Sequence, residues 1–195
     1  TPVDDYPTFH ITGMSMRRDA VYSTTIVGPP PMEDFYMGKA TERIFLPLIR
    51  MSVPDLVDMN MPVEGVFHNC IVVSVNKRYP GHAKKLMNAI WGLGLLSLSR
   101  CVVVVDADVD VQNVSQVAFH AFSNVDVGRD MLVTDGPVDA LDHAAPYFAY
   151  GSKVGFDATR KWPGEGVVRT WPDPAVMSDE IRARVDRRWS EVGLS

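Results

Sequence analysis

Long apolar runs are missing from this sequence. None reaches the roughly 18 residues that a helix needs to cross a bilayer, and the longest candidate, residues 89–98, is interrupted by Gly92 and Gly94. Charge of one sign is not in large excess either, because 19 Lys and Arg residues stand against 24 Asp and Glu residues. These absences argue against a membrane span and against a nucleic-acid-binding surface. With 46% hydrophobic residues and no low-complexity segment, the chain fits a globular protein, which we expect in the cytoplasm.

Cysteine is scarce. Only Cys70 and Cys101 occur, each inside an apolar, strand-like run. Buried free thiols of a reducing compartment are the first interpretation, and a disulfide between them is the alternative. An initiator Met is also absent, and we expect a fragment of a longer polypeptide or a processed product.

Self-contained catalytic motifs are absent as well. The chain has no G-x-S-x-G, no C-x-x-C, no phosphate-binding Walker loop and no G-x-G-x-x-G. Its five histidines lack metal-binding spacing, and we expect them at the surface or at helix ends. His82 follows Gly81 at an expected helix start, where it could help free backbone N–H groups to bind an anion.

The middle of the chain alternates strand-like and helix-like segments. Short β-branched runs predict strands at 70–75, 101–105 and 131–134. Apolar residues at helical spacing predict helices over 82–97 and 113–124, the second opened by an Asn-x-x-Gln cap. This order is typical of βαβ units, so we predict an α/β domain with a largely parallel sheet over residues 55–150.

Both flanks carry further elements. Residues 8–26 predict a β-hairpin with a polar turn at 17–19, ended by prolines 29–31, and a helix is expected over 33–49. A lone hairpin cannot bury both of its faces, so it belongs with strands that this chain lacks. We therefore divide the chain into four parts. Residues 1–31 form an incomplete unit and residues 32–54 a linking helix. Residues 55–150 form the α/β domain, and residues 151–195 form a C-terminal arm.

The C-terminal arm contains cations and indoles among Gly and Pro residues. We expect residues 151–171 to be irregular and a final helix to run from Pro174 to about Val192, capped by Asp173. Lys153 on such a Gly-rich loop would suit a phosphate. The alternative is a solvated loop pinned by Trp162.

Three aspartates follow the strand at 101–105. Asp106, Asp108 and Asp110 stand at the carboxyl end of an expected parallel strand, where carboxylates can hold a divalent metal. Acidic residues that merely end a strand and begin a helix are the alternative, and no Gly-rich nucleotide loop accompanies them.

Several short stretches, in the same order along the chain, resemble the UbiD-type decarboxylases. They are Arg17-Arg18-Asp19-Ala20-Val21-Tyr22, Gly28-Pro29-Pro30-Pro31-Met32-Glu33, Pro62-Val63-Glu64-Gly65, Tyr79-Pro80-Gly81-His82-Ala83-Lys84-Lys85, Asp142-His143-Ala144-Ala145-Pro146, Gly151-Ser152-Lys153-Val154-Gly155-Phe156-Asp157-Ala158-Thr159 and Lys161-Trp162-Pro163-Gly164-Glu165. The resemblance implies a subunit with an N-terminal α/β region, a split β-barrel that holds prenylated FMN, and a C-terminal α/β domain. Residues 1–31 would then end the barrel, and residues 55–150 would be the C-terminal domain.

The resemblance also implies a chemistry. Members of the family remove CO2 from aromatic or α,β-unsaturated acids, with prenylated FMN as the electron sink. The family's catalytic arginine, its acidic pair and its Asn, His and Glu metal ligands all precede the stretch at Arg17. No catalytic residue and no metal ligand is therefore assigned here, and we expect the chain alone to be inactive. Mn²⁺, with K⁺ as a further candidate, belongs to the full-length enzyme.

The resemblance assigns only a few cofactor-binding and substrate-pocket residues to this chain. Lys153 matches a lysine expected to approach the flavin phosphate, and Thr25 and Ile26 fall where the barrel backbone passes the cofactor. Phe35 and Met37 begin the helix that walls the substrate pocket, and their size favours an apolar or aromatic acid. Core packing of these two side chains is the alternative.

The resemblance implies partners too. Family members assemble through their C-terminal domains, so we expect a homodimer or a hexamer, together with the missing N-terminal cofactor domain. The apolar residues of the final helix are candidates for that contact: Ile181, Val185, Trp189 and Val192.

Two other functions stay open. The chain could be a non-catalytic subunit that serves oligomerisation or completes a substrate pocket. It could also be a DxD-type metal-dependent transferase, which predicts Mn²⁺ or Mg²⁺ at Asp106 and Asp108.

Overall fold

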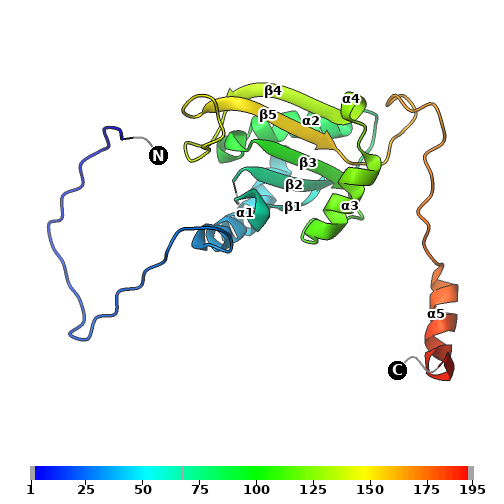
Figure 1. Cartoon of the computed structure of the whole chain (residues 1–195), viewed down its shortest axis with the longest axis horizontal. Helices are drawn as coiled ribbons and strands as arrows, with labels where there is room; N and C mark the ends of the chain where they lie inside the picture. Colours follow the sequence, from blue (N-terminus) through cyan, green and yellow to red (C-terminus); the bar gives the residue numbers. More distant parts are fainter. Residues whose placement is uncertain (1–2, 67, 193–195) are drawn as a thin grey trace.

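The computed structural model describes residues 3–66 and 68–192, without the side chains at 190 and 192, and centres on one five-stranded sheet (Figure 1). The strand order is β1-β2-β3-β5-β4. The strands are β1 (Leu56–Asn60), β2 (Cys70–Val75), β3 (Cys101–Asp106), β4 (Met131–Pro137) and β5 (Tyr150–Asp157). The central strands β2, β3 and β5 are parallel, in keeping with the expected largely parallel sheet, although β5 was not among the predicted strands. The edge strands β1 and β4 are antiparallel to their neighbours.

The helices are α1 (Glu33–Ser52), α2 (His82–Trp91), α3 (Val114–Asn124), α4 (Val127–Asp130) and α5 (Asp179–Arg188), with short 3₁₀ turns η1 (Val63–Gly65), η2 (Gly94–Leu98) and η3 (Trp189–Val192). Helices α1 to α4 lie around this sheet, whereas α5 lies apart from it at the end of the C-terminal segment (Figure 1). The pleat sends alternate side chains to opposite faces. Ile71, Val73 and Val75 therefore pack with α1 and α2, while Val72 packs with α3. Because both faces of β2 are covered by apolar residues, its sequence is apolar except for Ser74.

Local capping chemistry sets several helix boundaries. The Asn113 side chain accepts a hydrogen bond from the Gln116 N–H at 3.1 Å, which confirms the predicted start of α3. The predicted start of the last helix is wrong. Ser178 caps it by accepting from the Ile181 N–H at 3.3 Å, and acidic Asp179 and Glu180 fill its first turn. The helix expected over 82–97 ends at Trp91, because Gly92 and the left-handed Gly94 follow.

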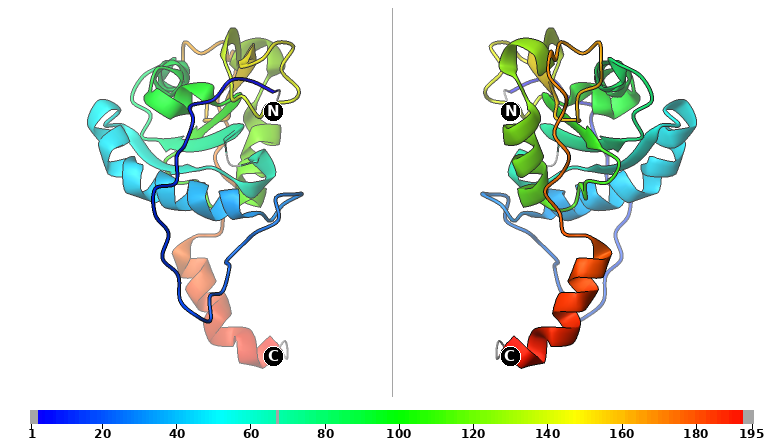
Figure 2. Two further views of the ribbon diagram at one scale, coloured as in Figure 1. Left: turned by 90° about the vertical axis from the view of Figure 1, so that its left-hand side faces the viewer. Right: turned by 90° about the vertical axis from the view of Figure 1, so that its right-hand side faces the viewer.

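The predicted hairpin over residues 8–26 is wrong for this structure. A turn forms at Arg18 and Asp19, but no strand flanks it, and apolar side chains such as Phe9 and Ile26 are exposed. Residues 3–31 run as extended chain outside the body (Figure 2). The described residues offer this segment no neighbouring strand with which to form a ladder. The division of the chain into four parts stays a prediction.

Strand β5 was missed by the sequence prediction. Its residues were expected to be irregular, yet Tyr150–Asp157 lies between β3 and β4 in the sheet. The glycines that suggested a loop serve packing instead. A Cβ at Gly155 would lie 2.5 Å from the Met87 sulfur, so a side chain there would displace the buried Met87 side chain of α2.

A buried carboxylate ties α1 to the sheet edge. Glu42 is 1% exposed and accepts hydrogen bonds from Lys39 Nζ at 2.9 and 3.0 Å and from the Met61 N–H at 2.6 Å. Arg43 lies 2.8 Å from the same carboxylate. Because a buried charge is tolerated only when paired and hydrogen-bonded, this network fixes α1 against β1. No helix within the described ranges, α1 included, is long and apolar enough to traverse a bilayer.

The two cysteines are free thiols, which confirms the first interpretation over a disulfide. Cys70 and Cys101 are register partners on β2 and β3, and both are partly buried. The hydrogen bond with Cys101, together with burial, raises the pKa of the Cys70 thiol above its ordinary value. Cys70 is therefore a protonated, poorly reactive thiol.

Gly155→Ala tests the close packing of α2 on β5. We expect a loss of about 1–3 kcal/mol in the free energy of unfolding, because the new methyl group meets the buried Met87 side chain. Urea unfolding measures this loss. Gly136→Ala on edge strand β4 is the matched control, since a Cβ there meets only ordinary contacts with Lys153. Equal losses in the two variants would contradict the packing argument.

Candidate functional site

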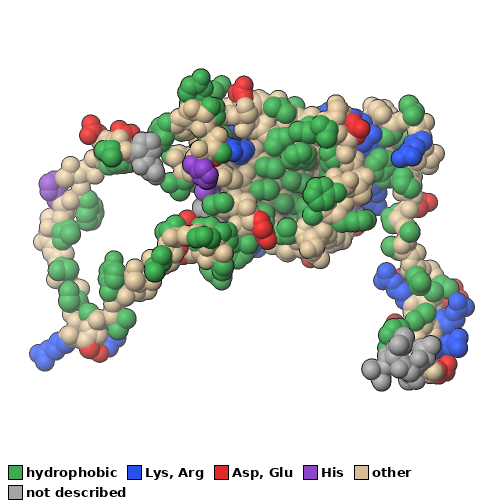
Figure 3. Space-filling model, in the orientation of Figure 1, with side chains coloured by type: hydrophobic (Ala, Val, Ile, Leu, Met, Phe, Trp, Pro, Cys, Tyr) green, Lys and Arg blue, Asp and Glu red, His purple; other side chains and the backbone are tan. Residues whose placement is uncertain are grey.

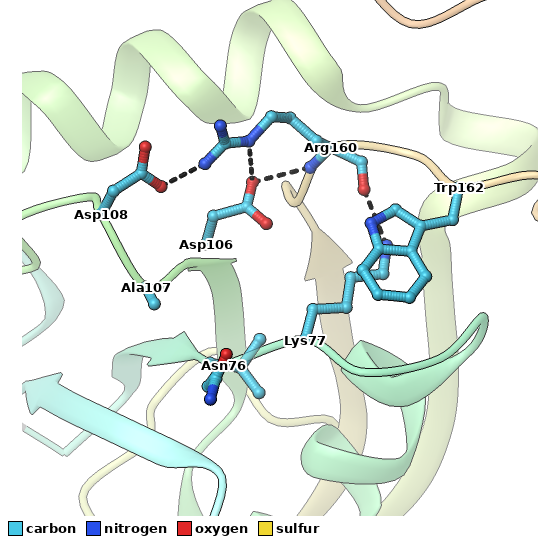
Figure 4. Close-up of a pocket in the computed structure, with 8 residues that line it drawn as sticks. Asn76, Lys77, Asp106, Ala107, Asp108, Arg160 and Trp162 are labelled. Carbon is cyan, nitrogen blue, oxygen red and sulfur yellow. Dashed lines mark hydrogen bonds and ion pairs between the residues drawn. The ribbon is translucent and has the colours of Figure 1, made fainter.

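Helices α2 and α3 leave neighbouring strands β2 and β3 toward opposite faces of the sheet (Figure 1). Such a change of side opens a crevice at the carboxyl ends of the strands, where α/β proteins commonly bind ligands. A cavity of about 420 Å³ lies there (Figure 4), and we call it the crevice. It is lined by Val75, Asn76, Lys77, Asp106, Ala107, Asp108, Arg160 and Trp162.

Arg160 dominates one wall of the crevice. Its Nε lies 3.1 Å from Asp106 Oδ2, and its backbone N–H donates to the same oxygen at 2.8 Å. Its terminal nitrogen also donates to Asp108 Oδ1. The two aspartates singled out in the sequence therefore face a guanidinium, which supplies the positive charge that a metal would otherwise bring.

Lys77 and Glu165 form the second ion pair. Lys77 Nζ lies 2.5 Å from Glu165 Oε2 and also donates to Thr159 Oγ1 at 2.9 Å and to the Arg160 carbonyl at 2.7 Å. All three donors of the ammonium are thereby used. The two side chains are 3% and 8% exposed, so the pair is held away from water.

The Glu165 carboxylate occupies the N-terminus of α2. Its Oε1 accepts from the Gly81 N–H at 2.8 Å, and its Oε2 accepts from the Trp162 N–H at 2.7 Å. Burial raises the pKa of this carboxyl, but the hydrogen bonds from Lys77, Trp162 and Gly81 outweigh it and hold the pKa below its usual value. The anion predicted at this helix start is thus the chain's own carboxylate.

His82 does not take part in that anion site. It is 2% exposed, and its ring stacks on Tyr79 with centroids 4.3 Å apart. Its Nε2 lies 3.5 Å from Asp55, yet burial lowers the pKa of the imidazole below its ordinary value. The residue is a packed helix-end histidine, the alternative that the sequence also favoured.

A second buried charge cluster supports the loop that carries Arg160. Lys161 Nζ donates to the carbonyls of Asp157 and Thr159 at 2.6 and 2.8 Å and lies 3.0 Å from the Asp157 carboxylate. Asp130 lies 3.4 Å away on the other side. Because this lysine side chain is 0% exposed, its partners fix the path of the chain after β5.

The three residues predicted to meet the flavin lie in different surroundings. Lys153 is on β5, 3% exposed, and its Nζ donates to the Ser97 carbonyl, while burial lowers the pKa of its ammonium. Thr25 donates to Glu33 at 3.2 Å, and Ile26 is exposed in the extended N-terminal segment. This chain does not bring the three together (Figure 1).

Phe35 and Met37 lie in the first turns of α1. Met37 is 63% exposed, so core packing does not account for it, whereas Phe35 is half-buried. The Phe35 ring contacts Tyr36 edge-on at 5.3 Å and lies 5.8 Å from Lys39 Nζ. This end of α1 therefore presents an apolar surface whose base is anchored by the Glu42 network.

Metal-binding clusters are not found. No group of three or more His, Cys, Asp or Glu side chains within the described ranges is arranged to hold a metal ion. Asp110 lies outside the crevice lining and accepts from the Gln112 N–H at 2.9 Å. Asp106 and Asp108 are instead paired with Arg160.

Comparison with known proteins identifies the family. The model of the 3-octaprenyl-4-hydroxybenzoate carboxy-lyase C-terminal domain matches residues 35–158. The chain belongs to the UbiD family. Uncharacterized proteins of Aquifex aeolicus and Archaeoglobus fulgidus are 50% and 51% identical to it over 194 and 193 residues, covering 100% and 98% of the chain. The chain spans about 40% of the length of these relatives.

Solved structures share this UbiD fold. Vanillic acid decarboxylase of Sedimentibacter hydroxybenzoicus in its open form aligns with a TM-score of 0.70 at 22% identity, covering 85% of this chain and 35% of that one. The UbiD-class enzyme HmfF of Pelotomaculum thermopropionicum, in complex with FMN, aligns with a TM-score of 0.57 at 26% identity, covering 71% and 31%. The match covers about one third of each of these two chains.

Sequence reasoning singled out Asp106, Asp108 and Trp162 but missed how they are held. Arg160 lies 54 positions after Asp106 in the sequence, and Glu165 lies 88 positions after Lys77. The order of the strands could have revealed these partners. The carboxyl ends of the parallel strands β2 and β3 and the segment that follows β5 all lie at the same edge of the sheet. That signal was hidden once β5 had been taken for a loop.

Glu165→Gln removes the charge at nearly constant size. We expect the free energy of unfolding to fall by about 3 kcal/mol at pH 7, because Lys77 is left as a buried cation without its partner. A carboxyl with a lowered folded pKa stabilises above its unfolded pKa, about 4.3, and loses that contribution as pH falls through the folded value. The difference between wild type and variant should therefore shrink as the pH falls below the unfolded pKa and through the lower folded pKa.

Urea unfolding across this pH range measures both effects. Glu180→Gln, which makes the same charge change on the exposed helix α5, is the matched control and should shift stability by only about 0.5 kcal/mol. A constant difference across the range, or equal losses in both variants, would show that the Glu165 charge does not hold the loop.

Proposed function

We propose that this chain is the C-terminal part of a decarboxylase that removes CO2 from aromatic or α,β-unsaturated carboxylic acids with prenylated FMN. The proposal rests on the UbiD family match over residues 35–158. HmfF, a UbiD-class relative, has been solved in complex with FMN and, in an evolved dimeric form, with prFMN. On this proposal the chain alone is inactive and acts as one part of a larger enzyme.

The ionisable side chains of the crevice are already paired with one another, which supports the proposal that the chain alone has no catalytic activity. Lys77 and Glu165 are paired with each other, and Arg160 is paired with Asp106 and Asp108. A general acid needs a pKa near the working pH, whereas the pKa of Glu165 is lowered. Proton donation to a decarboxylated substrate therefore falls to residues outside this chain, as do the ligands for Mn²⁺ and K⁺.

The cofactor requires a surface that this chain does not form by itself. Thr25 and Ile26 lie in the extended segment, and Lys153 is bonded to Ser97 inside the domain. We keep all three as proposed contacts of prenylated FMN in the full-length protein, where the N-terminal cofactor domain would pair with residues 3–31. Lys153 could meet a phosphate only by exchanging its contact with the Ser97 carbonyl.

The apolar end of α1 is the proposed wall of the substrate pocket. The exposed Met37 and the half-buried Phe35 suit an apolar or aromatic ring. The Glu42 network would keep this wall in place while a small carboxylic acid binds.

A non-catalytic, pocket-completing or oligomerising role is the second candidate. Apolar side chains are exposed on α1, including Ile44 and Leu48, and on α3, including Phe119 and Phe122. Figure 3 shows hydrophobic side chains gathered over the α3 side of the body. Such patches are typical of contact with another domain or subunit, including a dimer or hexamer. The Asp106–Arg160–Asp108 arrangement argues against the third candidate, a DxD-type transferase.

A reconstitution experiment tests the decarboxylase assignment. The full-length polypeptide and the 195-residue chain are each incubated with prenylated FMN and a panel of aromatic and α,β-unsaturated acids. We expect CO2 release by the full-length protein alone, because the chain's own ionisable groups at the crevice are paired. CO2 release by the short chain would contradict inactivity, and none from either would contradict the decarboxylase assignment.

Met37→Ala in the full-length enzyme tests the pocket wall. We expect KM for an aromatic acid to rise about tenfold with kcat little changed, since removing apolar contact of this size weakens binding by about 1–3 kcal/mol. Steady-state kinetics measures the two constants. Met51→Ala at the other end of α1 removes a methionine side chain that is still more exposed, and it should leave KM unchanged. Matching effects in both variants would remove Met37 from the pocket.

A further inference from the structure

We propose that the crevice binds an uncharged ring-bearing ligand through a vicinal diol, the chemistry shared by ribonucleosides and simple sugars. This site lies at the carboxyl ends of β2 and β3, apart from the Met37 end of α1, and the inference does not depend on the decarboxylase assignment. The proposal rests on the polar atoms of the crevice that the ion pairs do not use.

Several hydrogen-bonding atoms of the crevice have no partner among the described residues. They are Asp106 Oδ1, Asp108 Oδ2 and the carboxamide of Asn76. Figure 4 shows the second oxygen of Asp106 turned toward the open space beside Lys77. Carboxylate oxygens accept strongly from hydroxyl groups, and Arg160 holds both aspartates in place before a ligand arrives.

Trp162 supplies a flat apolar wall. The residue is 37% exposed and lines the cavity, and Lys77 Nζ lies 5.9 Å from the ring centroid. The backbone N–H of Trp162 is bound to Glu165, so the residue is positioned in advance. An indole beside acceptors for hydroxyl groups can stack on a nucleobase or pack on the face of a sugar ring.

The charges of the crevice argue against a phosphate. The N-terminus of α2, the natural anion site of this topology, already holds the Glu165 carboxylate. Lys77 is committed to the same carboxylate and to two further oxygens. A free anion would have to displace a buried charge that has three donors.

The same charges argue against a metal ion. Asp106 and Asp108 share the Arg160 guanidinium, whose positive charge would repel a cation placed between them. Lys77 is already paired with Glu165, and Arg160 is shared by the two aspartates, so an uncharged ligand can bind without disturbing either set of ion pairs.

NMR titration of the 195-residue chain tests the proposal. The probes are adenosine, 2′-deoxyadenosine, methyl α-glucoside, inorganic phosphate and Mg²⁺, followed at the Trp162 indole N–H and the Ala107 amide. We expect adenosine, methyl α-glucoside or both to shift these signals at millimolar concentration. If adenosine binds, 2′-deoxyadenosine should bind about tenfold more weakly, because it lacks the vicinal diol.

Two variants localise the binding. Asp108→Ala should weaken it about tenfold by removing an acceptor, and the side chain is 64% exposed, so the fold tolerates the change. Asp186→Ala on α5 makes the same charge change away from the crevice and should leave affinity unchanged. Binding of adenosine would identify ribonucleosides as the class of ligand that supplies the vicinal diol, and binding of methyl α-glucoside would identify sugars.

Four results would overturn the proposal. They are no shift with either diol, equal affinity for adenosine and 2′-deoxyadenosine without glucoside binding, unchanged affinity in Asp108→Ala, and shifts caused by phosphate or Mg²⁺ alone. None of these results bears on CO2 release by the full-length protein, which tests the decarboxylase assignment separately.

Discussion

The carboxylate of Glu165 joins segments that are far apart in the sequence. It binds Lys77 after β2, the first turn of α2 at Gly81, and its own loop at Trp162. Because the charge is almost fully buried, each of these contacts gains strength from the others, and the loss of one leaves polar groups unsatisfied. The crevice, the position of Trp162 and the path of the chain after β5 all depend on this arrangement.

Where the signal was local, the sequence predicted the structure well. The bounds of β2 agree with the prediction, because a β-branched run between two polar segments defines a buried strand. The start of α3 agrees because Asn113 caps it within its own turn. For β5 the deciding fact is the tertiary contact of Gly155 with Met87, which no neighbouring residue reveals. The last helix was extended too far toward its N-terminus because Asp173-Pro174 mimics the cap that Ser178 provides.

Helix α1 is linked by hydrogen bonds to the loop that follows β3. Lys39 of α1 donates to Gln112 at 2.9 Å, and Gln112 lies in the loop that leaves β3 after the crevice aspartates. The Gln112 amide in turn donates to the Met59 carbonyl of β1 at 2.9 Å. A polar network therefore joins the base of α1 and the sheet edge at β1 to the loop that follows β3. From the sequence one could predict that the charged residues of the crevice would be paired, but not which residues pair, since the partners come from distant segments.

The antiparallel edge strand β4 also has a bearing on how the protein behaves in concentrated solution. Its outer side has no strand beside it in the described sheet, and an open edge invites pairing with another molecule. Asp135 places a charge in this edge, held by Ser152 at 2.7 Å, and Pro137 offers no N–H at its end. A strand from a second chain would have to desolvate that carboxylate and do without one backbone donor. The edge is therefore protected against sheet-to-sheet aggregation by residues that contribute nothing to the core.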